Sequence, residues 1–225
     1  MRNWFWLLVS TVLWVGSAQA LPPERVEITY EIVRNTMTIA EALYQLEHNG
    51  RVYQITETSK GRGILALRGS TRRTSRGIVS DGLKPLEFTD ERTGRSTARA
   101  TFDWQAKTIT MQYDGDPRTE PLPAQAHDRL AFAFDYAFAP PRAGQLAFDL
   151  LDGRGLSRHV YVVGGRERLK IPAGEFDVLK LVRQTDDDRA EIWLASNLSY
   201  LPVRILVVEK DGTRYDQVAT KISTQ

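Results

Sequence analysis

The 225-residue sequence contains no cysteine. This absence excludes a disulfide framework, a thiolate nucleophile and a thiolate metal site. It also excludes a diacylated lipoprotein, because that modification requires a cysteine. An exported protein without disulfides is more typical of the bacterial periplasm than of a eukaryotic secretory route.

The sequence also lacks the common catalytic and nucleotide-binding motifs. It has three histidines, at positions 48, 127 and 159, with no HExxH or other metal-ligand spacing. It contains no GxSxG motif and no phosphate-binding GK[ST]. We therefore predict no cofactor and no metal site, and an enzyme ranks third among our functional hypotheses.

Long hydrophobic runs are absent except at the start of the chain. Arg2 precedes an apolar run from Trp4 to Val15, and Ala18-Gln19-Ala20 follows it. This pattern predicts a signal peptide over residues 1–20, cleaved after Ala20, and hence a periplasmic protein. An uncleaved membrane anchor is the alternative, but the run is shorter than the roughly 20 residues that span a bilayer. We predict no transmembrane span in the mature chain.

The mature chain has almost no net charge. Removing residues 1–20 leaves 205 residues and lowers the formal charge from +2 to +1, because Arg2 is lost. No global field is present to attract nucleic acid, so we predict no nucleic-acid partner. A chain of this length can bury a substantial core as one domain, and we predict a single β-rich domain over residues 21–225.

Apolar and polar residues alternate through most of the mature sequence, which predicts β-strands. Residues 25–34, 36–48 and 51–58 are expected to pair, with a type I′ turn at Asn49-Gly50. Many further short strands, separated by turn dipeptides, favour an antiparallel sandwich or barrel. Residues 116–125 are expected to form a loop, and further strands are predicted at 64–69, 76–79, 85–92, 96–104, 107–113, 145–151, 158–163, 168–171, 176–184, 190–195, 203–210 and 213–222.

One aromatic segment, HDRLAFAFDYAF at residues 127–138, interrupts the strands. It fits either an alternating strand or a helix with apolar residues on most faces. The alanines favour a helix, and Asp128 is suited to cap its first turn. We therefore predict a mainly β fold, an antiparallel open or half-closed β-barrel wrapped around one short helix.

Several segments resemble a bacterial exported family, domain of unknown function 3108. The similar stretches include VEITYEI (26–32), DGLKPLEFTDER (81–92), HDRLAFAF (127–134), IPAGEFDVLKLVR (171–183) and YLPVRI (200–205). The resemblance covers nearly the whole mature chain and rests on strand, turn and proline patterns. At fold level that family is similar to the open barrels of periplasmic lipoprotein carriers. It implies no catalytic residue.

Two groups of residues are candidates for binding. No acid occurs between Glu57 and Asp81, and this run contains Arg62, Arg68, Arg72 and Arg73. These arginines fit anionic groups such as lipid phosphates, or a charged edge strand that resists aggregation. The second group, expected to line an apolar cavity or to form ordinary core, comprises Trp104, Phe132, Phe134, Tyr136, Phe138 and Trp193.

The leading functional hypothesis is a soluble periplasmic binding or carrier module for an apolar or lipid-like ligand. The alternative is an envelope assembly or scaffold protein that acts through contacts with a protein partner.

Overall fold

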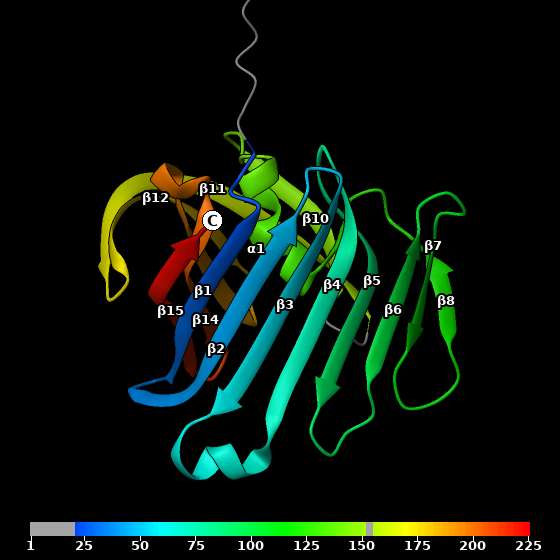
Figure 1. Cartoon of the computed structure of the whole chain (residues 1–225), viewed down its shortest axis with the longest axis horizontal. Helices are drawn as coiled ribbons and strands as arrows, with labels where there is room; N and C mark the ends of the chain where they lie inside the picture. Colours follow the sequence, from blue (N-terminus) through cyan, green and yellow to red (C-terminus); the bar gives the residue numbers. More distant parts are fainter. Residues whose placement is uncertain (1–20, 152–154) are drawn as a thin grey trace, which may run out of the picture.

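The computed structural model describes residues 21–151 and 155–225. The predicted signal peptide lies outside the described residues, as does the side chain of Arg68. Within the described part, the backbone forms one 15-stranded sheet around a single α-helix, and Figure 1 shows the sheet curving about that helix. The predicted fold class, an open antiparallel barrel around one short helix, is confirmed.

Successive strands pair with each other except β8 with β9, and the first strand pairs with the last. All pairs are antiparallel except β9 with β10. The sheet order is β8-β7-β6-β5-β4-β3-β2-β1-β15-β14-β13-β12-β11-β10-β9. The strands are β1 Arg25–Arg34, β2 Met37–His48, β3 Val52–Gly61, β4 Ser70–Ser80, β5 Gly82–Arg92, β6 Ala98–Asp103, β7 Thr108–Gln112, β8 Arg118–Pro121, β9 Ala126–Asp128, β10 Gln145–Leu151, β11 Leu156–Ile171, β12 Gly174–Gln184, β13 Asp188–Ala195, β14 Leu201–Glu209 and β15 Arg214–Thr224.

The turn between β2 and β3 is present but is not of type I′. That type requires positive φ at both central residues. Gly50 has a φ of +79°, whereas Asn49 is not in the positive-φ region. The side-chain Oδ1 of Asn49 instead accepts hydrogen bonds from the backbone N–H groups of Arg51 and Val52, each at 3.0 Å. Asn49 therefore stabilises the turn through its side chain.

The strand predicted at 64–69 is wrong, because Gly63–Arg68 forms a 3₁₀ helix, η1. Gly63 begins it and Gly69 follows it, with φ values of +58° and +83°, so the chain turns sharply at both ends. The apolar residues had suggested a strand, but glycine at both ends permits a compact reversal between β3 and β4.

Two other predictions also differ from the structure. The expected loop at 116–125 contains β8, and the strands expected at 158–163 and 168–171 are one strand, β11. The pairing of β11 with β12 shifts register between Val163 and Arg166, at the Gly164-Gly165 pair. Those glycines therefore mark a β-bulge and not a turn.

The aromatic segment forms α1, Arg129–Phe138. Asp128 caps it as predicted, since its Oδ1 accepts hydrogen bonds from Leu130 N at 2.8 Å and Ala131 N at 2.9 Å. Most of its side chains are buried, and they contact two hydrophobic clusters. Phe134 packs in the cluster formed mainly by β1–β7, and Phe132 and Tyr136 pack in the cluster formed by β10–β13. The helix thus packs between the two walls of the barrel and contacts both.

Strands β8 and β9 are the unpaired edges of the sheet, so backbone hydrogen bonds do not close the barrel. Side chains connect the two walls instead. Ser75 of β4 donates a hydrogen bond of 2.5 Å to Asp128, and Leu83 N of β5 donates one of 2.6 Å to Asp135 of α1. Closure therefore involves β4 and β5, and Figure 1 shows β6–β8 extending beyond them at the right of the view.

Candidate binding cavity

A cavity of about 730 Å³ lies inside the barrel beside α1. Its lining is buried near the helix, at Phe132 and Ala133, and half-buried or exposed at Ser59 and Glu209 near the strand ends. The cavity therefore opens at the end of the barrel where β3 and β14 finish. Its apolar and aromatic lining consists of Ile32, Tyr44, Phe132, Ala133, Leu150, Tyr161, Ala190, Ile192, Ile205, Val207 and Tyr215.

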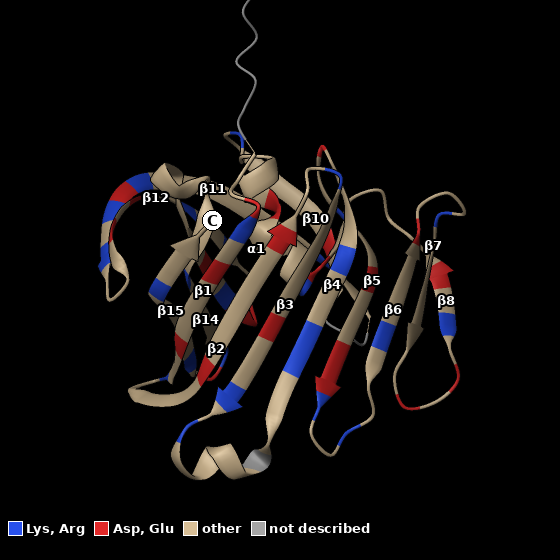
Figure 2. Cartoon of the chain, in the orientation of Figure 1, with Lys and Arg blue, Asp and Glu red and all other residues tan. Residues whose placement is uncertain are grey.

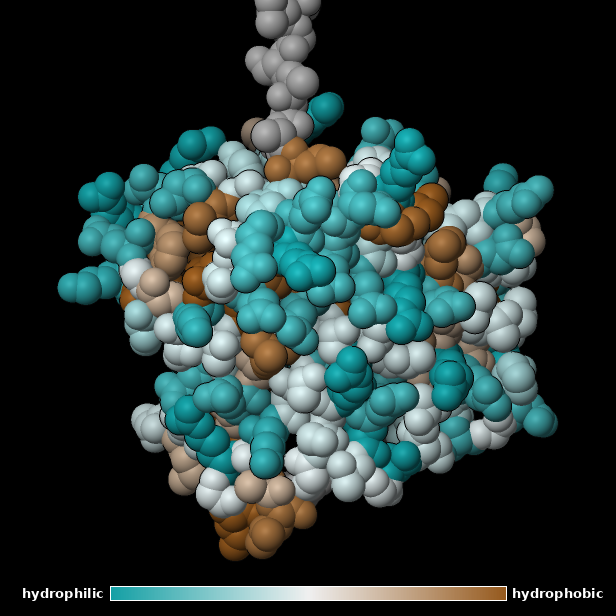
Figure 3. All heavy atoms as spheres, in the orientation of Figure 1, coloured by the Kyte–Doolittle hydropathy of each residue, from teal (hydrophilic) through white to brown (hydrophobic). Residues whose placement is uncertain are grey.

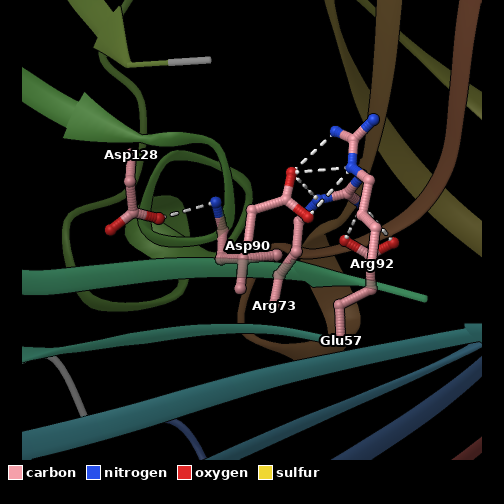
Figure 4. Close-up of polar contacts among 6 residues, drawn as sticks. Glu57, Arg73, Asp90, Arg92 and Asp128 are labelled. Atoms are coloured by element: carbon pink, nitrogen blue, oxygen red, sulfur yellow. Dashed lines mark hydrogen bonds and ion pairs between the residues drawn. The ribbon is translucent and has the colours of Figure 1, made fainter. Parts of the chain in front are cut away.

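An ionic network borders the cavity, and its members Glu57 and Arg73 belong to the lining (Figure 4). Arg73 Nη1 donates hydrogen bonds of 2.7 Å to both carboxylate oxygens of Glu57, and its Nε lies 3.1 Å from Asp90 Oδ2. Arg92 Nη2 donates to the same Asp90 oxygen at 2.7 Å. Burial acts to raise the pKa of Asp90, but hydrogen bonds from Arg92 and the charge of Arg73 lower it overall. The network of two acids and two arginines is internally neutral.

Arg129, the first residue of α1, adds a further cation to the cavity lining. Arg129 is exposed, and it makes no ion pair with any other described residue. The lining also contains the buried side-chain amide of Gln217, which lies beside the Tyr44 hydroxyl. The cavity thus offers a guanidinium without an ion pair and a buried amide beside apolar walls.

Of the four helix aromatics predicted to line a cavity, one does so. Phe132 lines it, whereas Phe134 and Tyr136 are buried in the two hydrophobic clusters. Phe138 is half-buried and meets the ring of His48 edge-on at 4.8 Å. Helical periodicity separates Phe134 from Phe132, because residues two apart on a helix point in different directions, whereas Tyr136 shares the face of Phe132 one turn further along.

Neither predicted tryptophan lines the cavity. Trp104 stacks on Phe102 with ring centroids 6.3 Å apart and donates a hydrogen bond of 2.7 Å to Pro85 O. Trp193 lies in a separate cluster, with the Arg204 guanidinium 4.7 Å from its ring centroid. Because neighbouring Ile192 lines the cavity, strand alternation directs Trp193 to the other face.

The four predicted arginines do not form one binding surface. Arg73 is buried in the cavity wall, whereas Arg72, the next residue on β4, is exposed on the opposite face. Arg62 lies between β3 and η1, where it pairs with Glu31 and Glu41. The backbone of Arg68 ends η1, and its side chain lies outside the described structure. Their role in binding anionic groups stays a prediction.

Sequence reasoning missed Tyr44, Glu57, Arg129 and Gln217 as cavity residues. A signal for Glu57 was available, because it shares a strand face with Tyr53 and Ile55, both of which are buried. A charged residue at an apolar-facing position indicates either an internal ion pair or a functional group. No comparable local signal identifies Arg129, because its position depends on how α1 sits in the barrel.

The pKa values of two further carboxylates near the helix are strongly raised. Burial raises the pKa of Asp128 to about 6 and that of Asp135 to about 7, although hydrogen bonds from Ser75 and Leu83 N respectively act to lower them. Burial also lowers the pKa of His127 to about 4. Within the described ranges, no group of three or more histidine, aspartate or glutamate residues is arranged to hold a metal ion.

No helix in the described part of the chain is long and apolar enough to cross a membrane. No curated protein matches the sequence. A solved structure of a beta-barrel-like protein of domain of unknown function DUF1849 from Brucella abortus is similar, with a TM-score of 0.58 and 10% identity. The alignment covers 91% of this chain and 98% of that one, and it supports the fold alone.

Two more distant structures also align over 91% of this chain. One, from Parabacteroides distasonis ATCC 8503, is provisionally described as a lipoprotein and matches at 11% identity, TM-score 0.39 and full coverage of its own chain (100%). The other, from Bacteroides fragilis NCTC 9343, is provisionally described as exported with a YmcC-like fold and matches at 13% identity, TM-score 0.37 and 99% coverage. A family model matches residues 25–218, and the chain therefore belongs to the family described as Protein of unknown function (DUF3108).

Proposed function

We propose that this protein is a soluble periplasmic binding or carrier module for an amphiphile with an acyl chain and an anionic group. The observation that carries the proposal is the cavity beside α1, which combines apolar walls with the unpaired guanidinium of Arg129. Export by the signal peptide at residues 1–20, and folding of residues 21–225 as one domain, belong to the same proposal.

The size and lining of the cavity suit such a ligand. Small-molecule sites in proteins are typically about 300–1,000 Å³ and mostly apolar, with a few oriented polar groups. A volume of about 730 Å³ lies within this range. Each methylene transferred from water to the apolar wall contributes about 0.8 kcal/mol, so a chain of several carbons supplies most of the affinity.

The lining places a cation beside the helix with which an anionic group can pair. Of the acids in the lining, Glu57 is paired with Arg73 and Asp188 with Arg183, and Glu209 lies exposed at the opening. Arg129 is the lining cation without an ion pair, and the side-chain amide of Gln217 supplies a further polar group. Hydrogen bonds from arginine to a carboxylate or phosphate are among the stronger ones, because both partners are charged.

The proposal is tested with the mature protein purified from the periplasm. Native mass spectrometry should show a co-purifying lipid, and delipidated protein should bind a dansylated fatty acid with increased fluorescence. Arg129→Gln should weaken that binding about tenfold, since one charged hydrogen bond is lost. Arg99→Gln changes an exposed arginine of β6 and should leave binding unchanged. Delipidated wild-type protein that binds no fatty acid would contradict the carrier role.

A second function, envelope assembly through a protein partner, is favoured by the unpaired edge strand β8. Exposed edge strands can pair with a strand of another chain. In that case Thr119→Pro, at the centre of β8, should abolish partner binding and leave fatty-acid binding unchanged. A partner retained by that variant would exclude the β8 edge as its docking site.

A further inference from the structure

The connection between β3 and β4 exposes two large apolar side chains. Ile64 is 82% exposed and Leu67 is 87% exposed, the highest values among the exposed large hydrophobic residues of the described chain. Both belong to η1, and Figure 3 shows a hydrophobic patch at this end of the molecule, at the bottom of the view. We call the side chains of Ile64 and Leu67 the η1 tip.

The η1 tip projects from an anchored segment. Arg62, immediately before η1, forms ion pairs of 2.8 Å with Glu31 and 2.9 Å with Glu41. Its backbone N–H also donates to Ile39 O at 2.9 Å. After η1, Ser70 N donates to Thr93 Oγ1 at 3.0 Å. Contacts on both sides thus hold the segment against β1, β2 and the turn after β5, so the two side chains protrude from a defined place.

The surroundings of the η1 tip are basic (Figure 2). The sequence has no acid from residue 58 to residue 80. Lys60 and Arg95 are exposed, and among the described residues neither makes an ion pair. Of the acids near this end, Glu31 and Glu41 are paired with Arg62, and Glu91 lies opposite Arg72 on the outer face. Two exposed cations, Lys60 and Arg95, therefore lie next to η1 and its contacting turn, and the acid Glu91 lies beside the cation Arg72.

We propose that the η1 tip docks onto an anionic lipid surface, with Ile64 and Leu67 entering the interface and Lys60 and Arg95 meeting lipid phosphates. Two protruding side chains present far less than the roughly 800 Å² per partner of a stable protein interface. They suffice for a reversible membrane contact when basic residues add electrostatic attraction.

The η1 tip lies at the end of the barrel where the cavity opens. Ser59, two residues before the end of β3, lines the cavity opening, and η1 begins four residues later. Asn35 N donates to Arg214 O at 2.8 Å, so the β1–β2 turn and the start of β15 lie at the same end. A membrane docked at the η1 tip therefore faces the opening of the cavity. Docking does not depend on what the cavity binds.

The test is flotation of the mature protein with vesicles of phosphatidylcholine containing 30% phosphatidylglycerol, against vesicles of phosphatidylcholine alone. Wild type should float with the anionic vesicles at low salt, and binding should fall as salt screens the charges. Ile64→Asn/Leu67→Asn should lower binding at least about tenfold, because the apolar contact is lost. Its melting temperature should match wild type, since both side chains are exposed.

Val160→Asn/Val162→Asn is the matched control, because it changes two exposed apolar residues on β11, 39% and 48% exposed. It should bind vesicles as wild type does. The proposal is overturned if the wild-type protein does not bind anionic vesicles at low salt, or if the tip variant binds them as wild type does. Absence of vesicle binding by the wild-type protein, together with binding of a specific protein partner that the tip variant no longer binds, would assign the surface to that partner instead. Fatty-acid binding in solution, measured on the same variants, tests the cavity separately.

Discussion

The carboxylate of Asp135 occupies the space that a side chain at Gly82 would need. A Cβ built on Gly82 would lie 2.5 Å from Asp135 Oδ1, and the same oxygen accepts a 2.6 Å hydrogen bond from Leu83 N. This contact connects α1 to β5 at the place where the sheet is not closed by backbone pairing. It depends on glycine at residue 82, where φ is +110°.

We expect Gly82→Ala to destabilise the protein by at least about 2 kcal/mol, because it adds backbone strain and displaces the carboxylate. Gly94→Ala is the control, since Gly94 has φ of +72° but open space around its Cβ position. That variant should lose only about 1 kcal/mol. Urea unfolding followed by circular dichroism measures both, and equal losses would show that the Asp135 contact contributes nothing.

Asp135 should make stability depend on pH. Burial raises its pKa from 3.8 to about 7 in the folded protein, so the folded state binds the proton more tightly than the unfolded state. Stability should therefore be greater at low pH and fall as pH rises between about 4 and 7. Asp128, with its pKa raised to about 6, acts in the same direction.

Asp135→Asn should remove this part of the pH dependence while keeping an oxygen that can accept from Leu83 N. The free energy of unfolding of the variant, relative to that of wild type, should rise by on the order of 2 kcal/mol as the pH is raised from 5 to 7.5. Unfolding curves at several pH values measure the difference. A constant difference across this range would mean that Asp135 titrates normally.

Phe134 should be among the most important residues of the core. It is fully buried, and its ring centroid lies 6.1 Å from that of Tyr44. Phe134→Ala should cost roughly 3–5 kcal/mol, as for other buried aromatic residues. Phe138→Ala, at the half-buried end of the same helix, should cost less. A loss under about 1 kcal/mol for Phe134→Ala would mean that α1 packs loosely.

The architecture could be predicted largely from sequence, and the reasons are local. Strand alternation, as in Val26, Ile28 and Tyr30, specifies which face is buried, and all three are buried in the structure. Asp128 followed by an alanine-rich aromatic run specified the helix and its cap. These features depend on neighbours in sequence, so they are readable without knowledge of the fold.

The cavity could not be predicted in the same way, because its residues come from distant strands. Phe132 and Phe134 have the same side chain two positions apart, yet only Phe132 lines the cavity, since the rotation of α1 decides which residue faces it. Arg72 and Arg73 were expected to act together, but strand alternation places them on opposite faces. The charged run was treated as one surface because the strand was expected to begin at Arg76, whereas β4 begins at Ser70 and separates its members.

The shared helix contacts predict one cooperative unit. Because α1 packs against strands from both halves of the chain, neither half buries its apolar face alone. Thermal unfolding should therefore show one transition with the same midpoint by far-ultraviolet circular dichroism and tryptophan fluorescence. Two transitions, separating the residues before 116 from those after 125, would contradict a single domain.

A substitution that fills the cavity should separate a ligand site from an ordinary core. Ala190 of β13 is buried and lines the cavity, so Ala190→Trp would place a large apolar ring in the space proposed for the acyl chain. We expect at least about a tenfold loss of fatty-acid affinity without a comparable loss of stability, because the added ring occupies existing volume and does not force packed atoms apart. Ala106→Trp adds the same ring at an exposed position and should leave affinity unchanged. Fluorescence titration and thermal unfolding measure the two quantities.

A strongly destabilised Ala190→Trp protein would indicate that the region is packed and not open. A stable variant that binds as wild type would place the acyl chain elsewhere.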